Sequence, residues 1–353
     1  MKIGILTFPK AINYGAALQA TALRRVLLNR AEKVCFLNYS CKDIDSTSKI
    51  FDISNLFSVK YTIAHLYNMP EAIKRKKNFS NYWKKHFEFS SSNPKEYDAV
   101  IVGSDQVWNY NLTGDDFFYF LNFKKDAVKK ISYAASFGLP MIDKAHADKI
   151  LPLLNDFDYL SVREKQAAKI IKENMGSDVP VVCDPTLLLD KSEWKKIAAK
   201  KPENSGYIFV YTVFNSDKIW EYAKKLSEKT GLPIKTISYS KLHKRDAIYD
   251  YIAGPDDWVN YMLGADYVVT NSFHGVAFSI NFNKNFFFDM PPKKAGVGSR
   301  ISDITERYSL ENRNISADGF TETTDAPDFT KANTLLEEDR KFSFEFIDSF
   351  LKN

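Results

Sequence analysis

The residues best suited to chemistry lie between positions 265 and 278. The pattern predicts a short buried strand over 267–270, a polar turn, and a helix that begins at His274. The turn brings together Asn271, Ser272, His274 and Gly275. Open α/β sheets present ligand-contacting residues at the carboxyl ends of their strands, and free amides at a helix start attract anions. We therefore expect an anion-binding, acid–base site here; a structural role for His274 is the alternative.

Two more polar turns follow predicted strands in the first half of the chain. The strand 3–8 leads to Asn13, Tyr14 and Gln19, which we expect to face a ligand, with helix capping by Asn13 as the alternative. The strand 97–102 leads to Asp105, which could act as a base or accept hydrogen bonds from sugar hydroxyls, and to Trp108, which could stack on a sugar ring. Their alternatives are a helix cap for Asp105 and a core position for Trp108.

Two arginines near predicted strand ends suit a phosphate or carboxylate, because a guanidinium pairs with either through two hydrogen bonds. Arg163 follows the predicted strand 159–162, and Arg300 follows a loop over 291–298 that looks able to swing over a cleft. The alternatives are a salt bridge of Arg163 with Glu164 and a solvated Arg300. No cluster has metal-ligand spacing, so we predict no metal, and there is neither a Walker loop nor a dinucleotide-binding glycine motif.

These turns belong to a chain that alternates strands and helices, which predicts an α/β fold with two doubly wound domains facing across a cleft. In the first half we expect strands over 3–8, 33–39, 97–102, 130–136, 159–162 and 179–183, and helices over 16–30, 145–157 and 166–174. In the second half we expect strands over 207–214, 233–239, 267–270 and 286–289, and helices over 216–229, 255–263, from 274, and over 331–353. A lysine-rich connection over 191–204 marks the boundary between a first domain at 1–192 and a second domain at 205–330. The last helix, over 331–353, follows the second domain.

Charge, cysteine content and the length of the apolar runs indicate which ligands and which cellular location to expect. The net charge of +5 and pI near 8.7 fit an anionic substrate or an acidic membrane surface but are too weak to indicate nucleic acid. The chain has three cysteines, an odd number, and their spacing is not that of a disulfide framework. We therefore expect the cysteines to be small buried side chains rather than partners in disulfides. The first apolar run is too short for a signal peptide and none is long enough to span a bilayer, so we expect a cytoplasmic protein.

Between residues 74 and 87, basic and aromatic side chains alternate. The lysines and arginine at 74–77, 84 and 85 interleave with aromatics at 79, 82, 83 and 87. One interpretation is a patch that contacts anionic lipid or a lipid-linked acceptor at the inner face of a membrane. The other, which we favour, is a solvated helix whose aromatics pack on their own domain.

Five motifs together resemble the polysaccharide pyruvyl transferase family. In chain order they are Asn13-Tyr14-Gly15-Ala16-Ala17-Leu18-Gln19, Gly103-Ser104-Asp105-Gln106-Val107-Trp108, Ser161-Val162-Arg163-Glu164, Asp184-Pro185-Thr186 and Asn271-Ser272-Phe273-His274-Gly275. The resemblance covers most of the chain up to about residue 306. It implies a fold like that of GT-B glycosyltransferases. It also implies transfer of pyruvate from phosphoenolpyruvate to paired hydroxyls of a sugar or lipid-linked oligosaccharide, without a further cofactor.

The resemblance also implies roles for residues. The family's histidine matches His274 and its arginine matches Arg163, but many members carry an arginine where this chain has Ser272. We therefore expect Arg300 to supply the missing cation. We expect His274 and Asp105 to act in acid–base catalysis. The donor should contact the two arginines together with Asn271, Ser272 and Gly275. The acceptor should contact Asn13, Tyr14, Gln19 and Trp108. A nucleotide-sugar glycosyltransferase and a non-catalytic sugar-binding relative are the competing hypotheses.

Overall fold

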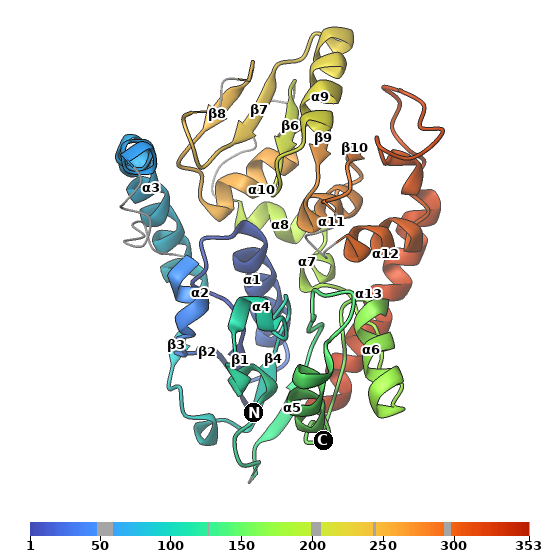
Figure 1. Ribbon diagram of the computed structural model, residues 1–353. Coiled ribbons are helices and arrows are strands. Elements are labelled where there is room, and N and C mark those ends of the chain that lie inside the picture. The colour runs from blue at the N-terminus through green and yellow to red at the C-terminus, as the bar shows by residue number, and fades with distance from the viewer. Residues whose placement is uncertain (48–58, 126, 199–205, 243–244, 293–297, 353) are drawn as a thin grey trace.

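The computed structural model describes residues 1–47, 59–125, 127–198, 206–242, 245–292 and 298–352. Within these ranges the chain forms two five-stranded sheets, one above the other in Figure 1, with helices around both. Every strand pairs in parallel with its neighbours. The predicted α/β architecture of two Rossmann-like, doubly wound domains is confirmed.

The first sheet has the strand order β3-β2-β1-β4-β5. Its strands are β1 (Lys2–Leu6), β2 (Lys33–Leu37), β3 (Phe89–Ser90), β4 (Ala99–Val102) and β5 (Lys129–Ser132). The central strands are continuous apolar runs because helices cover both faces of a parallel sheet. The segments predicted as strands at 159–162 and 179–183 join this sheet only through isolated bridges. Pro180 lies within the second of these segments and has no N–H to extend a ladder.

The second sheet repeats this order. Its strands are arranged β10-β9-β6-β7-β8, with β6 (Ile208–Tyr211), β7 (Ile234–Ile237), β8 (Ile248–Asp250), β9 (Tyr267–Thr270) and β10 (Asn285–Phe288). Counted from its own first strand, each sheet therefore reads 3-2-1-4-5. In this order the connections leave in opposite directions from the first and fourth strands, and ligands of such sheets bind at that point. The loops after β1 and β4, and after β6 and β9, occupy it.

Helices cover both sheets. Those before the second sheet are α1 (Tyr14–Leu28), α2 (Lys42–Thr47), α3 (Val59–His86), α4 (Tyr110–Thr113), α5 (Lys144–Leu154), α6 (Lys165–Met175), α7 (Pro185–Leu188) and α8 (Lys191–Ile197). Those after its first strand are α9 (Asp217–Thr230), α10 (Pro255–Gly264), α11 (Phe273–Asn281), α12 (Ser299–Arg307) and α13 (Thr330–Leu351). Neither α12 nor the edge strand β8 is predicted from the sequence.

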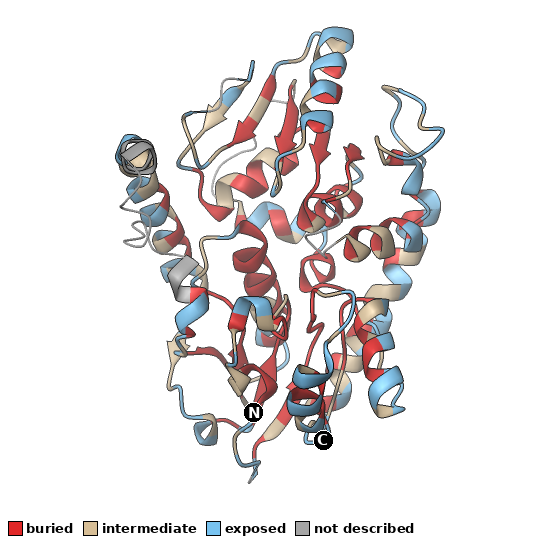
Figure 2. Cartoon of the chain, in the orientation of Figure 1, coloured by how far each residue is buried: buried red, intermediate tan, exposed pale blue. Residues whose placement is uncertain are grey.

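One apolar core runs through both domains. Helix α1 is buried over most of its surface because it lies between its own sheet and the second domain. Figure 2 shows this continuous buried zone where the domains meet. Helix α8 falls inside the predicted connection and buries Trp194 against Phe278 of α11. The rest of that connection, from 199 to 205, lies outside the described residues.

The chain ends by returning to the first domain. Ser343 in α13 accepts a hydrogen bond from the amide of Cys183 at 2.9 Å, and Asp348 pairs with Arg30 at 2.9 Å. Phe350 packs edge-on against Tyr159, with ring centroids 5.8 Å apart. Both chain ends consequently lie at the same end of the molecule, away from the second domain (Figure 1).

The predictions for cysteines and for the basic–aromatic stretch can be compared with burial. All three cysteines are buried and unpaired with one another, as predicted. In α3 the aromatic rings of Phe79 and Tyr82 belong to the core, so the interpretation that these aromatics pack on their own domain is confirmed. Across the described ranges, none of the helices combines the length and apolar character needed to span a membrane.

Candidate active site

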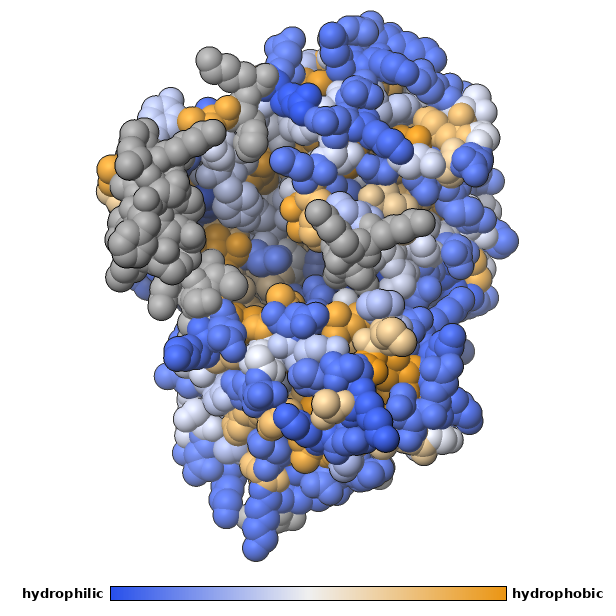
Figure 3. Space-filling view, viewed as in Figure 1, coloured by the Kyte–Doolittle hydropathy of each residue, from blue (hydrophilic) through white to orange (hydrophobic). Residues whose placement is uncertain are grey.

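A cavity of about 360 Å³ lies where the two sheets face each other. It is lined by the loops after β1, β4, β6 and β9, which are the four loops at the points of reversed connection. The face shown in Figure 3 is hollowed at mid-height, where the domains meet. Of the predicted site residues, this cavity brings together Asn13, Asp105, Asn271, Ser272, His274 and Arg300.

The turn after β9 is held in place by its own polar side chains. Asn271 accepts hydrogen bonds from the amides of Val213 and Phe214 and donates to the carbonyl of Phe214 at 2.7 Å. Ser272 is the N-cap of α11, accepting a hydrogen bond from the amide of Gly275 at 3.3 Å. These two side chains line the cavity, but their polar atoms mainly fix the backbone that carries His274.

Gly275 has a packing role. A Cβ at this position would lie 2.4 Å from Oγ1 of Thr270, at the end of β9. The absent side chain therefore allows the first turn of α11 to lie close to its own strand. The expected role of Gly275 at the donor stays a prediction.

His274 lies against the first domain. A Cβ on Gly15, in the first turn of α1, would lie 2.1 Å from Nδ1 of His274 and 2.7 Å from its Cγ. The imidazole of the second domain thus occupies the space that any larger residue at position 15 would fill. His274 is buried, and its Nε2 lies 3.8 Å from Oδ2 of Asp184 in the first domain.

Arg163 is the centre of a buried charge network. Its Nη1 donates to Oδ2 of Asp184 at 3.0 Å and lies 3.7 Å from Oδ1 of Asp105. Its Nε lies 3.5 Å from Oε2 of Glu164. Asp184 also accepts hydrogen bonds from the hydroxyl of Ser104 and from the backbone and hydroxyl of Thr186. The predicted salt bridge of Arg163 with Glu164 is therefore present, within a larger network.

Arg300 differs from Arg163 in having no acidic partner among the described residues. It is buried in α12, and its guanidinium lies 5.9 Å from the ring of Phe273, whose ring also lies 4.8 Å from Arg163. Phe273 and Arg300 are shared with a second cavity of about 380 Å³, on the side of Asp184 and α12. Residues 293–297 of the loop before α12 lie outside the described residues.

Three buried nitrogens of this site have no hydrogen-bond partner within the described ranges. They are Nη2 of Arg163, Nε2 of His274 and Nε of Arg300. Buried polar groups are almost always paired, and each one left unpaired costs about 1–3 kcal/mol. His274 lines the first cavity, Arg163 lines the second, and Arg300 lines both, so the three nitrogens lie around the boundary of the two cavities and suit a ligand there that offers several acceptor oxygens.

Burial sets the protonation states of the site. Burial lowers the pKa of His274 below its usual value, although Asp184 and Asp105 oppose this shift. Burial would raise the pKa of Asp184, but the positive charges beside it (His274 when it is protonated, and Arg163 at any pH) and the hydrogen bonds from Thr186 outweigh burial and lower the pKa. Burial, together with repulsion from Arg163, lowers the pKa of Arg300 to about 10. At neutral pH the site therefore holds a neutral imidazole beside a guanidinium, that of Arg300, which forms no ion pair with the residues that the structure describes.

A comparison of the sequence with models of protein families identifies the family of this chain. The family described as polysaccharide pyruvyl transferase matches residues 13–288. The chain belongs to the polysaccharide pyruvyl transferase family. The matched range begins at Asn13 and contains Asp105, Arg163 and His274, whereas Arg300, which lines the cavity, follows the matched range.

Curated protein sequences and solved structures were compared as well. No curated protein sequence matches the chain significantly. The UDP-GlcNAc 2-epimerase of Methanocaldococcus jannaschii is similar with 12% identity and a TM-score of 0.47, over 96% of this chain and 99% of that one. The E. coli heptosyltransferase WaaC with ADP has 11% identity and a TM-score of 0.38, over 85% and 90%.

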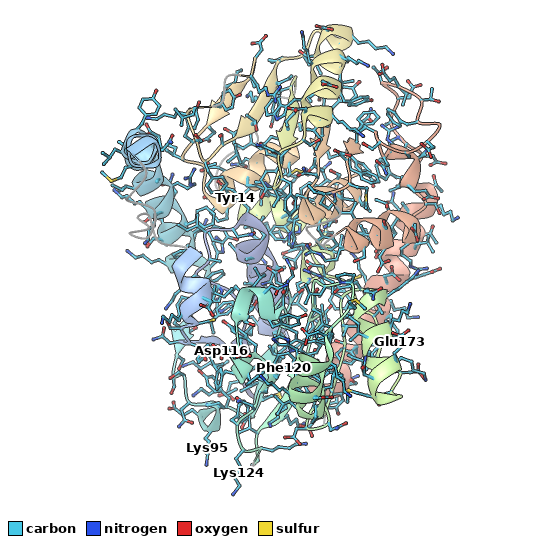
Figure 4. All side chains as sticks on the ribbon, in the orientation of Figure 1. Tyr14, Lys95, Asp116, Phe120, Lys124 and Glu173 are labelled. Atoms are coloured by element: carbon cyan, nitrogen blue, oxygen red, sulfur yellow. The ribbon has the colours of Figure 1, made fainter. Side chains whose placement is uncertain are left out.

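Within the pyruvyl transferase family motifs, three expected acceptor contacts are wrong. Tyr14 is fully buried at the end of α1 that meets the second domain (Figure 4), where its hydroxyl donates to the carbonyl of Ala253 at 3.0 Å. Gln19 is buried and donates to the hydroxyl of Thr7 at 2.9 Å. Trp108 is a core residue that stacks on Phe120 and donates to the carbonyl of Tyr119.

Asn13 remains a candidate, because it lines the cavity while capping α1. Three residues of the site were not singled out from the sequence. Gly15 provides space for His274, Asp184 joins His274 to Arg163, and the ring of Phe273 separates the two cavities. All three lie inside the family motifs, but only their contacts reveal what they do.

Proposed function

We propose that this pyruvyl transferase family member transfers pyruvate from phosphoenolpyruvate to two neighbouring hydroxyls of a surface-glycan sugar, forming a cyclic ketal and releasing phosphate. The observation that carries the choice of a small polyanionic donor is the group of three unpartnered buried nitrogens on Arg163, His274 and Arg300. Phosphoenolpyruvate offers phosphate and carboxylate oxygens to such donors. No cofactor is needed for this reaction.

The two arginines would share the donor unequally. Three carboxylates already surround Arg163, so its positive charge is largely compensated and it offers mainly the N–H groups of Nη2. Arg300 has no such compensation in the described structure, so we assign it as the main cation for the donor. Arg300 also lines the cavity, which supports a catalytic family member over a non-catalytic sugar-binding relative.

The proposed chemistry balances without any other reagent. Neutral His274 takes the proton of the first sugar hydroxyl and delivers it to the methylene carbon of the donor, which becomes a methyl group. The hydroxyl oxygen bonds to the carbon that carries the phosphate, and the C–O bond to phosphate then breaks as the second hydroxyl oxygen attacks. Asp105 accepts the second proton, which leaves with phosphate. Positioned acid–base groups contribute about 10²–10⁴-fold to such reactions.

The pH dependence tests the role of His274. Because burial lowers its pKa, His274 is neutral in the free enzyme at neutral pH, and kcat/KM should be constant above about pH 6.5 and fall only on the acid side. Arg300→Ala removes a charge that lowers this pKa, so the acid limb should move to higher pH. A profile of kcat/KM that instead falls as the pH rises through neutrality would assign His274 as an acid in the free enzyme.

Arg300→Ala should also weaken the donor. Loss of a charge-assisted hydrogen bond costs about 1.5–3 kcal/mol, so the KM for phosphoenolpyruvate should rise about ten- to a hundredfold. Ser272 lines the same cavity, and Ser272→Arg in the Arg300→Ala background should restore part of the loss. Ser272→Ala is the control for the lost helix cap. An unchanged KM in Arg300→Ala would make Arg300 irrelevant to the donor.

Ligand-dependent melting distinguishes this proposal from a nucleotide-sugar glycosyltransferase. A donor that binds only the folded chain stabilises it by about 2.7 kcal/mol at a hundredfold excess over Kd. Phosphoenolpyruvate should therefore raise the melting temperature, and Arg300→Ala should reduce that shift. Equal or larger shifts with UDP or GDP, and none with phosphoenolpyruvate, would contradict the proposal.

A further inference from the structure

Helix α3 carries more than the whole positive excess of the chain. Of the 49 lysines and arginines seven lie in Val59–His86, and of the 44 aspartates and glutamates only Glu71 does. Since the net charge of the chain is +5, the remainder is slightly acidic. The net positive charge of this helix thus exceeds that of the whole chain, and neither the fold nor the cavity explains this concentration.

The buried side of α3 ties the two domains together. Arg75 is buried, donates to the carbonyls of Ser238 and Tyr251 in the second domain, and lies 4.1 Å from the ring of Tyr239. Asn78 donates to the carbonyl of Ile252 at 2.8 Å. Figure 1 shows α3 at one flank of the molecule, reaching from the first domain to the level of the second. Its inner side is therefore occupied, and its orientation is fixed.

The outer side of α3 is apolar toward one end and basic toward the other. Leu66, Pro70, Ile73 and Lys77 fall on one face of a helix and are all exposed, Leu66 and Ile73 by 51% each. Exposed lysines at 74, 76, 84 and 85 flank or continue this face. None of these five lysines has an ion pair within the described ranges, and Glu71 is already paired with Lys241 at 2.8 Å.

We propose that the outer face of α3, defined by Leu66, Tyr67, Pro70, Ile73 and the five exposed lysines, docks on a lipid bilayer that contains anionic lipids. Lysines attract anionic headgroups, while exposed aliphatic and aromatic side chains enter the boundary between headgroups and acyl chains. An acidic protein or a nucleic acid would match the charge but would leave the apolar end of the face uncovered. The proposal is independent of the reaction, because binding to vesicles needs no substrate.

Co-sedimentation of the full chain with vesicles of phosphatidylcholine, with and without phosphatidylglycerol, tests this docking. We expect binding only to the anionic vesicles, and weaker binding at high salt. Each lysine near an anionic surface contributes about fivefold, so the Lys74→Gln, Lys76→Gln, Lys77→Gln variant should bind about a hundredfold more weakly. A control variant removes three exposed lysines of α9, Lys218→Gln, Lys224→Gln and Lys229→Gln, and should bind like the parent.

The apolar end is tested separately by Leu66→Ser with Ile73→Ser, which should also weaken binding to anionic vesicles. Unchanged melting temperatures would show that the variants are folded, as expected for exposed side chains. Equal loss in the α3 and α9 lysine variants would overturn the proposal, since any basic surface would then serve. Binding to neither type of vesicle would also overturn it and leave a macromolecular partner for this face. If the serine variant bound anionic vesicles as well as the parent does, the proposed contact of Leu66 and Ile73 with the bilayer would be overturned.

Discussion

Gly15→Ala is expected to lower turnover by about a hundredfold or more, as much as loss of His274 itself. The new Cβ would lie 2.1 Å from Nδ1 of His274 and 2.7 Å from Cγ, so the whole ring must move and not only its tip. Forcing a methyl group into this filled contact costs about 1–3 kcal/mol, and the better helix propensity of alanine offsets at most about 1 kcal/mol of that cost. We therefore expect a folded but inactive variant that melts somewhat lower than the parent.

The matched control places Gly15→Ala in the His274→Ala background. Without the imidazole the added methyl group has room, so the double variant should be no less active than His274→Ala alone. Steady-state turnover and melting temperature of the three variants measure this coupling. If Gly15→Ala retained normal turnover, the ring of His274 would not need the position that it has here, and its assignment as the acid–base group would be wrong.

Asp184→Asn is expected to destabilise the fold by about 3–5 kcal/mol, because it leaves the buried guanidinium of Arg163 without its nearest counter-charge. The Asp184 side chain is fully buried and lies 3.0 Å from Arg163. Asp184 is also the nearby charge that most strongly opposes the lowering of the His274 pKa. The acid limb of kcat/KM should therefore move to lower pH, opposite to its shift in Arg300→Ala.

Asp105→Asn provides the comparison for Asp184. Asp105 lies farther from Arg163, at 3.7 Å, and its side chain retains some exposure at the cavity. Its loss should therefore cost less stability, as measured by denaturant unfolding, while still lowering turnover. Equal unfolding free energies for the two variants would show that Asp184 has no special place in the buried network.

The fold could largely be predicted from the sequence because its signals are local. Continuous apolar runs such as Tyr267–Thr270 specify buried parallel strands, and β9 has the predicted bounds. Helix α12 gives a weaker signal, because the glycine-rich stretch before it suggested a loop, and its buried Arg300 does not follow the usual pattern of an apolar face. The two bridging segments near Val162 look like strands in composition, but their pairing depends on Pro180, which cannot donate.

The site was harder to predict because its contacts join distant positions. His274 and Asp105 were found as polar residues after strands, and both line the cavity. Trp108 follows the same kind of turn, yet its ring packs into the first-domain core against Phe120. The residues next to Trp108 in the sequence do not distinguish its buried position from the cavity positions of Asp105 and His274. Likewise, a glycine at the start of a helix carries no sign that an imidazole from the other domain will lie upon it.

The return of α13 to the first domain has a mechanical consequence. Two polypeptide connections join the second domain to the first, one after α8 and one before α13, instead of a single linker. Together with the shared core and the contacts of α3 with the second domain, these two connections restrict rotation of the second domain about either connection alone. Any movement that opened the cavity between the domains would lift the imidazole of His274 off Gly15 and separate it from Asp184.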